Sequence, residues 1–350
     1  MTRVERLRAQ LQNYEAAYIT SRANIFYYSG FTSEDAALLI SKNQALLLTD
    51  SRYFVQAKMQ SPDFLLYDIS KGLSGAIQAM PGVFEILYEE HYLTVERQMQ
   101  LAKAAGKNCR VVPRQERLSA LRKCKEPEEI EKIQAAEALG DAAFSDILNK
   151  IRPGMSEREI ALEIEFFMRK NGASGLSFET IAASGVRSAM PHGTASEKII
   201  ERGDLLTLDF GCVLDGYCSD MTRTVAIGTA DSKAKELYEV VLTAQEAALS
   251  KIAPGVSCAE IDRTARDVIR EAGYGDYFGH ALGHSVGIEI HESPVFSPKS
   301  KDILEEGHVI TVEPGIYLEG FGGVRIEDVV AICGKKARNL TKSPKNFIII

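Results

Sequence analysis

Residues 203–217 read GDLLTLDFGCVLDGY, and residues 307–321 read GHVITVEPGIYLEGF. The two stretches align without gaps at an offset of 104 residues, and their glycines, one threonine and one leucine recur at identical positions. Each stretch holds an apolar strand pattern, an acid, a glycine and a second strand pattern, a combination typical of a β-hairpin. The sequence therefore contains two copies of one strand-forming unit.

A second pair of related segments precedes the two copies. Residues 150–160 read KIRPGMSEREI and residues 251–261 read KIAPGVSCAEI, at an offset of 101 residues. In each segment a serine, Ser156 or Ser257, follows a Pro-Gly pair and stands three residues before a glutamate. This spacing predicts a capping box at the start of a helix. Solenoid arrays have many more copies, so a repeat that occurs only twice indicates two halves related by pseudo-twofold symmetry.

Acids occupy equivalent positions in the two copies. Asp209 aligns with Glu313, and Asp220 lies close to the counterpart of Glu327. Asp209 follows Leu-Leu-Thr-Leu and Glu313 follows Val-Ile-Thr-Val, so both are predicted to be buried, with no cation nearby in the sequence. An acid in a strand often pairs with Lys or Arg, but burying several unpaired carboxylates is costly. We therefore expect these acids to converge between the two halves and to bind divalent cations.

Histidines supply a second kind of ligand. His284 and His291 both lie in residues 279–292, which read GHALGHSVGIEIHE. Oxygen ligands with one imidazole suit Mn²⁺, Co²⁺, Zn²⁺ or Fe²⁺. A separation of seven residues would place the two histidines on opposite faces of a straight strand. Unless the strand bulges, we expect one of them to be a metal ligand and the other to lie outside the ligand set.

Composition restricts the class of protein. The 350 residues are 45% hydrophobic and 25% charged, which is typical of a soluble globular protein with one large and one smaller domain. A net charge of −7 with dispersed basic residues argues against a nucleic-acid partner. No apolar run approaches the roughly 20 residues that span a bilayer, and the N-terminus does not resemble a signal peptide. Six cysteines without a CxxC pair favour reduced thiols and a cytoplasmic location.

The pattern of the chain changes near residue 123. Residues 1–122 alternate short helix and strand patterns, including a predicted hairpin formed by 36–40 and 44–49, and contain no nucleotide-binding loop. Pro127 with the two glutamates that follow it predicts the start of a long helix. We therefore expect an α/β (α+β) chain with a small mixed α/β N-terminal domain, 1–122, and a larger domain, 123–350, that carries the repeat.

An ordered set of motifs resembles one protein family. The motifs are RSAMPHG, LDFG, SDMTRT, HALGHSVGIEIHE, TVEPGIY and RIEDVV. Together they closely resemble the pita-bread metallopeptidases, and within these the proline-specific branch of Xaa-Pro aminopeptidases and Xaa-Pro dipeptidases (prolidases). The resemblance extends from about Pro127 to the C-terminus, and more loosely through NIFYYSGFT and LLLTDSRYFVQA in the first 122 residues. It implies an internally duplicated pita-bread fold, in agreement with the repeat.

The resemblance also implies a dinuclear metal site. Asp209 would bind one metal, Asp220 and Glu327 would bridge both, and His284 and Glu313 would complete the other. The cofactors would be two divalent metal ions, with Mn²⁺ expected and Co²⁺ or Zn²⁺ as alternatives. They would activate a water molecule, whose proton Glu313 would take.

Further residues receive roles through the same resemblance. His280 resembles the proton-shuttling histidine of the branch. His192 and His291 would form hydrogen bonds with the substrate around the scissile bond. Tyr317 and Arg325 would support the ligands from outside the metal site. The predicted catalytic residues are therefore Glu313, His280, His192 and His291.

The leading prediction is an Xaa-Pro aminopeptidase that acts on peptides with proline in the second position. An Xaa-Pro bond has no N–H on its nitrogen, so its pocket needs an apolar wall rather than an acceptor. Phe178 is a candidate for that wall and equally a candidate core residue. The alternative is an Xaa-Pro dipeptidase, and the TDSRYFVQA stretch favours the aminopeptidase. We expect a cytoplasmic homodimer, with the small domain against the neighbour's active site and with neither nucleic acid nor membrane as a partner.

Three other functions fit the sequence less well. A methionine aminopeptidase shares the five ligands but ordinarily lacks the N-terminal domain, and His280 and RSAMPHG fit it poorly. A creatine-hydrolysing enzyme of the same fold works without the metal ligands that are intact here. The remaining alternative, from a different class, is a binding protein that keeps the fold without catalysis. The absence of bound divalent metal would identify it.

Overall fold

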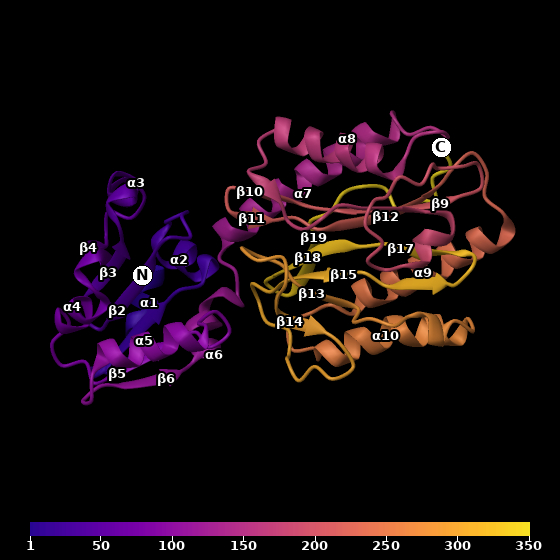
Figure 1. The fold of residues 1–350 in the computed structure, drawn as a ribbon. Coiled ribbons are helices and arrows are strands. Elements are labelled where there is room, and N and C mark those ends of the chain that lie inside the picture. Colours follow the sequence, from indigo (N-terminus) through magenta and orange to yellow (C-terminus); the bar gives the residue numbers. More distant parts are fainter. The chain divides into compact units, whose positions relative to one another are not determined.

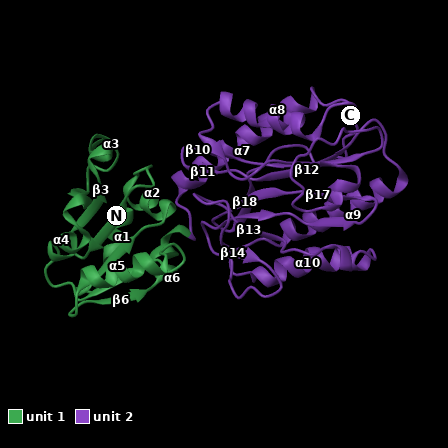
Figure 2. Cartoon of the chain, in the orientation of Figure 1, with its two compact units in different colours: residues 1–122 green, residues 123–350 purple.

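The computed structural model describes residues 1–350, which separate into two compact units, residues 1–122 and residues 123–350 (Figure 2). Helices and strands are mixed in both units, so the predicted α/β class is confirmed. No helix combines the length and the apolar composition that crossing a lipid bilayer requires.

The first unit is built on one six-stranded sheet of strand order β4-β3-β2-β1-β5-β6. The helices of this unit are α1 (Arg3–Gln10), α2 (Arg22–Ser29), α3 (Phe54–Gln60), α4 (Leu73–Gln78), α5 (Val95–Ala105) and α6 (Gln115–Ser119). Its strands are β1 (Glu15–Ile19), β2 (Ala37–Ser41), β3 (Ala45–Thr49), β4 (Leu65–Asp68), β5 (Glu85–Tyr88) and β6 (Arg110–Pro113). Strands β2 and β3 pair antiparallel, as the predicted hairpin requires.

The second unit contains four long helices and short strands in several sheets. The helices are α7 (Pro127–Leu148), α8 (Glu157–Lys170), α9 (Ser232–Lys251) and α10 (Cys258–Glu271). The strands of the first half are β7 (Gly175–Leu176), β8 (Ile181–Ser184), β9 (Leu205–Phe210), β10 (Cys212–Leu214), β11 (Tyr217–Cys218) and β12 (Met221–Ala226). Those of the second half are β13 (Gly283–Ser285), β14 (Glu292–Phe296), β15 (Val309–Val312), β16 (Gly315–Leu318), β17 (Gly322–Arg325), β18 (Asp328–Cys333) and β19 (Lys336–Asn339).

The internal repeat appears in the strand order. In the first half β9 lies between β8 and β12, and both neighbours are antiparallel to it. In the second half β15 lies between β13 and β18, again with antiparallel neighbours. Since β9 and β15 are the aligned strands of the two copies, the two halves share one topology. The pseudo-twofold relationship predicted from the sequence is therefore present in the fold.

The hairpin predicted within each copy is wrong. Strand β9 does not pair with β10, which pairs with β7 and β11, and β15 does not pair with β16, which pairs with β17. Each copy is a strand that bends into the first strand of the following hairpin. The bend at Gly211 brings the chain against Ser219, where an added Cβ would lie 1.9 Å from the carbonyl oxygen. Only glycine fits there, so the glycine marks a crowded bend rather than a hairpin turn.

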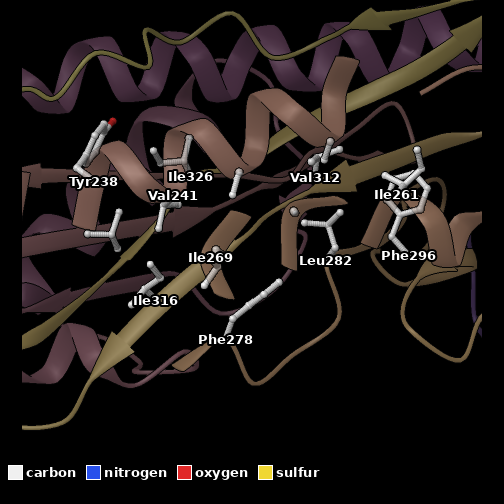
Figure 3. Close-up of a cluster of buried hydrophobic side chains, with 14 of the residues drawn as sticks. Tyr238, Val241, Ile261, Ile269, Phe278, Leu282, Phe296, Val312, Ile316 and Ile326 are labelled. Atoms are coloured by element: carbon white, nitrogen blue, oxygen red, sulfur yellow. The ribbon is translucent and has the colours of Figure 1, made fainter. Parts of the chain in front are cut away.

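Each half buries its sheet beneath a pair of helices. Helices α7 and α8 pack on β8, β9 and β12, and α9 and α10 pack on the second set of strands; the two helix pairs lie on opposite sides of the strands in Figure 1. Figure 3 shows Val241 of α9 and Ile269 of α10 in the same buried cluster as Ile316 and Val312. Burying an aliphatic side chain of this size contributes about 1.5–3 kcal/mol. These two cores hold the strands that carry the acids.

All three predicted helix starts are confirmed, but one of them lacks the predicted capping box. Helix α7 begins at Pro127, and Ser156 caps α8 with its hydroxyl while Glu159 completes the capping box. The capping box predicted at Ser257 is wrong, because the Ser257 side chain makes no capping hydrogen bond to α10. Helix α10 still begins at the next residue, Cys258, so burial of its apolar face is sufficient to define it.

Candidate metal centre

A cavity of about 400 Å³ opens between the two halves of the second unit. Its walls carry all five predicted metal ligands, four acids and one histidine, together with three further histidines. The lining residues are Phe178, Glu179, Ile181, Pro191, His192, Thr194, Asp209, Asp220, His280, Ala281, Gly283, His284, Ile290, His291, Val295, Glu313, Arg325 and Glu327. Of the predicted site residues only Tyr317 does not line this cavity; it lies behind His280 and Arg325.

Three of the predicted ligands form a compact cluster. One potential ligand atom from each of Asp220, His284 and Glu327 lies within 4.8 Å of the others. Asp220 directly precedes β12, His284 lies in β13, and Glu327 stands between β17 and β18. The cluster therefore draws on both copies of the repeat, as the sequence predicted.

The hydrogen bonding of His284 prepares its ring for a cation. Nδ1 lies 3.2 Å from the carbonyl oxygen of Ser285, and because a carbonyl can only accept, Nδ1 carries the proton. The Nε2 lone pair then faces carboxylate oxygens of Asp220 at 3.5 Å and of Glu313 at 3.4 Å. Burial and the neighbouring His291 lower the pKa of His284 to about 4, so the ring is neutral near pH 7. Three sets of lone pairs converge, and a cation between them would remove their repulsion.

Asp209 and Glu313 complete the acidic wall, each with a partner of its own. Asp209 Oδ2 accepts a hydrogen bond from the Arg325 guanidinium, a cation that comes from 116 residues away in the sequence. Asp209 Oδ1 is buried without any hydrogen-bond partner, an arrangement that leaves one acceptor free for a metal. Thr311 donates its hydroxyl to Glu313 Oε1 at 3.0 Å. No cation is near Asp209 in the sequence, as expected, but the fold brings Arg325 into contact with it.

The buried carboxylates disfavour the charged state of one another. Burial raises the pKa of Asp220 well above its ordinary value, and the neighbouring Glu327 raises it further. The pKa of Glu327 is raised in the same way, by burial and then by Glu313. Burial also raises the pKa of Glu313, to about 8, although Arg325 opposes this shift. Such an arrangement suits bound cations, because the positive charge replaces the water that the carboxylates have lost.

The donor set fits divalent metal ions. Carboxylate oxygens and one neutral imidazole nitrogen are ligands for Mn²⁺, Zn²⁺ and similar ions, and the unpartnered oxygen of Asp209 is the kind of buried acceptor that a metal satisfies. None of the six cysteines lines the cavity, and all of them are free thiols. The site is therefore a hard, oxygen-rich site with one nitrogen ligand.

His284 and His291 do not lie on one straight strand, so the condition for placing them on opposite faces is not met. The β13–β14 pairing shifts register after His284, and β14 begins only at Glu292. The chain between them is irregular, so both rings line the cavity, with their centroids 4.3 Å apart in an edge-to-face arrangement. The irregular chain acts like the bulge considered above, and it lets both histidines face the same cavity.

A hydrogen-bonded chain links three other predicted residues. His280 Nδ1 lies 2.8 Å from the Ala281 carbonyl oxygen, so Nδ1 carries the proton and Nε2 accepts from the Tyr317 hydroxyl at 2.9 Å. The Tyr317 oxygen accepts from Arg325 Nη1 at 2.9 Å. Burial lowers the pKa of His280 to about 4. The Arg325 guanidinium thus connects Asp209 with the ring of His280 through one tyrosine.

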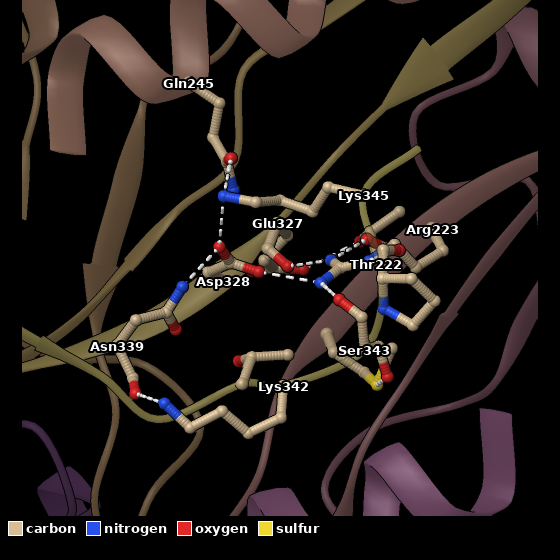
Figure 4. Close-up of polar contacts among 12 residues, drawn as sticks. Thr222, Arg223, Gln245, Glu327, Asp328, Asn339, Lys342, Ser343 and Lys345 are labelled. Carbon is tan, nitrogen blue, oxygen red and sulfur yellow. Dashed lines mark hydrogen bonds and ion pairs between the residues drawn. The ribbon is translucent and has the colours of Figure 1, made fainter. Parts of the chain in front are cut away.

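A buried ion-pair network holds the start of β18, directly after Glu327 (Figure 4). Arg223 of β12 donates to the Glu327 carbonyl oxygen at 2.5 Å and to Asp328 Oδ1 at 2.8 Å. Lys345 adds a second cation to Asp328 at 2.9 Å. Burial alone would raise the pKa of Asp328, but Arg223 and Lys345 hold it below its ordinary value. The side chains of Glu327 and Asp328 therefore point to different sites, the cavity and this network.

Glu137 of α7 also contacts the site, and it was not predicted. Its carboxylate accepts a hydrogen bond from the Asp220 backbone N–H at 2.8 Å and another from the Thr341 hydroxyl at 2.8 Å. It is completely buried, and burial raises its pKa to about 8. A signal existed in the sequence, because Glu137 lies on the apolar face that Ile133 and Phe144 define in α7. An acid on such a face needs a partner inside the protein.

Comparison with known proteins identifies the family. A family model for metallopeptidase family M24 matches residues 131–333, and a model for the creatinase/prolidase N-terminal domain matches residues 3–124. The chain belongs to metallopeptidase family M24. It is therefore a metallopeptidase, and the resemblance to the pita-bread metallopeptidases is confirmed. Membership of M24 implies divalent metal ions, which the donor set described above fits.

Individual M24 relatives cover almost the whole chain. The Xaa-Pro dipeptidase of Pyrococcus furiosus is 38% identical over 342 residues, which are 95% of each chain. The structure of an Xaa-Pro dipeptidase from Bacillus anthracis matches with a TM-score of 0.95 at 42% identity and covers 99% of both chains. The structure of an X-Pro aminopeptidase from Thermotoga maritima matches with a TM-score of 0.92 at 40% identity, covering 98% of this chain and 99% of that one.

Proposed function

We propose that this M24 peptidase is an Xaa-Pro dipeptidase that uses two divalent cations. The observation that carries the proposal is the cavity itself, which combines the five predicted metal ligands with histidines and an apolar wall. Relatives described as Xaa-Pro dipeptidases at 38% and 42% identity support this specificity. The sequence favoured the aminopeptidase, which stays the second candidate because of the likeness to the Thermotoga maritima enzyme. The Xaa-Pro dipeptidase, which was the alternative in the sequence analysis, is therefore the first candidate.

The proposed metal ligands are those predicted from the motifs: Asp209, Asp220, His284, Glu313 and Glu327. When bound, the cations would activate a water molecule and stabilise negative charge that develops on the substrate carbonyl. We propose Mn²⁺ as the native ion, with Co²⁺ or Zn²⁺ as alternatives. Thr311 and Thr222 orient Glu313 and Glu327 by donating hydroxyl hydrogen bonds to their carboxylates.

Proton transfer is the proposed task of Glu313 and His280. A carboxylate whose pKa is raised toward neutrality by burial holds a proton more readily than an exposed one. The Glu313 carboxylate would accept the proton of the attacking water. The proton would then pass from Glu313 to the leaving nitrogen, which restores the carboxylate, and His280, whose unprotonated Nε2 accepts from the Tyr317 hydroxyl, would assist that transfer. Arg325 keeps the tyrosine oxygen in place.

Substrate binding is assigned to the cavity walls. His192 and His291 line the cavity and would donate or accept hydrogen bonds at the scissile Xaa-Pro bond. Phe178, Ile290 and Val295 line it as well and offer apolar surface to a proline ring. The proline nitrogen has no N–H, so this part of the wall needs no acceptor.

The oligomeric state and the cellular location are proposed as well. We propose a homodimer with the small N-terminal unit against the neighbour's active site, which sedimentation equilibrium of the full chain would test. We also propose a cytoplasmic location, which the six free thiols support.

Substrate length is the decisive test of the proposed function. The metal-loaded protein is assayed with an Xaa-Pro dipeptide and with the tripeptide that extends it by one residue. We expect hydrolysis of the dipeptide with a kcat/KM at least tenfold above that of the tripeptide. Cleavage of the tripeptide alone would establish the aminopeptidase, and hydrolysis of neither peptide with any divalent metal would refute both.

A further inference from the structure

A glutamate outside the cavity forms hydrogen bonds with a segment that makes up one wall of the cavity. Residues 184–196, which we call the His192 segment, run from the end of β8 through a short 3₁₀ helix (Gly185–Ala189) to Ser196. Pro191, His192 and Thr194 of this segment line the cavity. Apart from its short 3₁₀ helix and a turn closed by the Gly193 N–H on the Met190 carbonyl oxygen, the segment has no regular structure, so contacts with the rest of the unit contribute to the position of His192.

Glu157 supplies those contacts at both ends of the segment. Its Oε1 accepts from the backbone N–H of Ser184 at 2.7 Å and from the Ser184 hydroxyl at 2.9 Å. Its Oε2 accepts from the N–H of Ser196 at 3.1 Å and from the Ser196 hydroxyl at 2.6 Å. One carboxylate thus joins the first and last residues of the segment and closes it into a loop.

An arginine extends this attachment toward the middle of the segment. Arg187 Nε lies 3.0 Å from Glu157 Oε2, and its Nη2 donates to the Thr194 carbonyl oxygen at 2.6 Å. Thr194 stands two residues after His192, so the arginine reaches across the loop that carries the histidine. The Glu157 carboxylate is fully buried, whereas the Arg187 side chain is 28% exposed. A buried carboxylate with this many charge-assisted hydrogen bonds holds its partners in one geometry.

Glu157 is itself held rigidly. It is the first residue of α8, its N–H donates to the Lys198 carbonyl oxygen at 3.0 Å, and the helix is anchored by buried Ile160 and Ile164. The opposite side of the His192 segment rests on β17, through Gly323 N–H to Ser188 Oγ at 2.8 Å. The segment is therefore clamped between α8 and the strand that leads to Glu327.

The second half of the unit contains a comparable arrangement at positions that are not the repeat counterparts of Glu157 and Arg187. Asp262 of α10 is buried, pairs with Arg266 and accepts from the Leu282 N–H at 3.2 Å. Arg266 donates to the carbonyl oxygens of Phe278 and His280 at 2.9 Å each. In both halves a buried helix acid and an arginine hold the segment that carries a cavity histidine.

We propose that Glu157 is a positioning residue for the peptidase reaction: it holds the His192 segment so that His192 reaches the substrate. The inference rests on the proposed function, in which His192 contacts the substrate. Glu157 touches neither substrate nor metal, so its loss should alter the placement of His192 and leave the metal ligands unchanged.

The test is a double-mutant cycle between Glu157 and His192, with hydrolysis of an Xaa-Pro dipeptide by the Mn²⁺-loaded full chain as the readout. The Glu157→Gln variant keeps the volume but replaces one acceptor oxygen with a donor. We expect it to lower kcat/KM by about 10- to 100-fold, the scale of loss that a misplaced contact group causes. In a His192→Ala background the same change should cost less than threefold, because the residue that Glu157 positions is absent.

A matched control lies two residues away. Glu159 is an exposed glutamate in the first turn of the same helix, where it completes the capping box and does not touch the His192 segment. Because glutamine also serves in a capping box, Glu159→Gln should leave kcat/KM within twofold of the wild type. Metal content per chain should equal that of the wild type in both variants.

Hydrogen–deuterium exchange gives a readout that does not depend on activity. Backbone amides of residues 185–196 should exchange faster in Glu157→Gln, whereas those of β9 and β12 should not change. If Glu157→Gln fails to fold, Ser196→Ala removes one of the hydrogen bonds and should show the same coupling to His192 with a smaller loss.

The outcomes separate the inference from the proposed function. An equal loss of kcat/KM in the wild-type and His192→Ala backgrounds, or unchanged activity and exchange in folded Glu157→Gln, would overturn the role of Glu157. A wild-type protein that hydrolyses no Xaa-Pro peptide would refute the proposed function instead. In that case faster exchange of residues 185–196 would still support the structural part of the inference, and unchanged exchange would refute it.

Discussion

At the scale of single residues, the cavity concentrates carboxylates that destabilise one another. Asp220, Glu313 and Glu327 are buried, and the pKa of each is raised. Without a cation the folded chain must either protonate these groups or hold like charges close together. The carboxylates that metal binding requires therefore lower the stability of the metal-free protein.

Neutralising one of these acids should stabilise the metal-free protein. We expect Asp220→Asn to raise the free energy of unfolding by on the order of 1–2 kcal/mol at pH 8 in the presence of a chelator, since one pKa unit corresponds to about 1.4 kcal/mol. Mn²⁺ at 100 times its dissociation constant should stabilise the wild type by about 2.7 kcal/mol and the variant by much less. Urea unfolding measures both quantities. A variant less stable than the metal-free wild type would contradict this account.

His308 gives a pH dependence that is independent of the cavity. It is buried, its Nδ1 accepts the Glu305 N–H at 3.2 Å, and burial, followed by Lys125 nearby, lowers its pKa to about 4. The unfolded chain binds a proton below about pH 6.5 that the folded chain does not bind. Its contribution to stability is therefore complete above pH 6.5 and is lost as the pH falls toward 4.

We expect this group alone to cost the wild type about 2 kcal/mol between pH 7 and pH 5. His308→Gln cannot titrate, so the stability of the wild type relative to the variant should fall by that amount over the same interval. Urea unfolding of both proteins at the two pH values measures the difference, and shifts common to both cancel. A constant difference between the two proteins would show that His308 titrates normally when folded.

At the scale of elements, local sequence predicted helix and strand starts better than strand partners. Pro127 and Ser156 mark helix starts as expected, because caps act within one turn. The pairing of β9 with β12 instead of β10 depends on the crowded bend at Gly211, which only the tertiary structure determines. For the same reason the register shift after His284 and the attachment of the His192 segment to Glu157 could not be predicted.

The two copies of the capping pattern provide a matched pair. Ser156 accepts the N–H of Glu159 at 3.1 Å, whereas the Ser257 side chain caps nothing. Ser156→Ala should therefore destabilise the protein by about 1 kcal/mol, and Ser257→Ala should stay within about 0.5 kcal/mol of the wild type. Denaturant midpoints of the two variants test this. Equal losses would mean that Ser257 caps α10 in solution.

At the scale of the whole molecule, the repeat allowed the four acids of the site to be inferred, and the family resemblance supplied the other site residues. The alignment of Asp209 with Glu313 predicted that acids from two halves converge, and the fold brings them to one cavity. The arginine that pairs with Asp209 could not be derived from spacing, because Arg325 lies 116 residues away. Nor could the contact of Glu137 with Asp220, since nothing local indicates which loop a buried helix acid meets.

The two compact units should respond differently to metal. We propose that residues 1–122 and 123–350 are separate domains, and all the proposed ligands lie in the second. Saturating Mn²⁺ should therefore slow amide exchange in the strands around the cavity, such as β12 and β15, and leave the six-stranded sheet of the first unit unchanged. Hydrogen–deuterium exchange with and without Mn²⁺ measures this. Equal protection of both units would show that they behave as one cooperative unit.

The central claim is that the buried acids and His284 hold metal ions that drive peptide hydrolysis. The most direct measurement is the rate of Xaa-Pro dipeptide hydrolysis by metal-free protein as Mn²⁺ is added in known ratios to the chain. We predict no hydrolysis without metal and a rate that rises until two ions per chain are bound. Hydrolysis that does not depend on metal, or a chain that binds two ions and hydrolyses no Xaa-Pro peptide, would contradict the account.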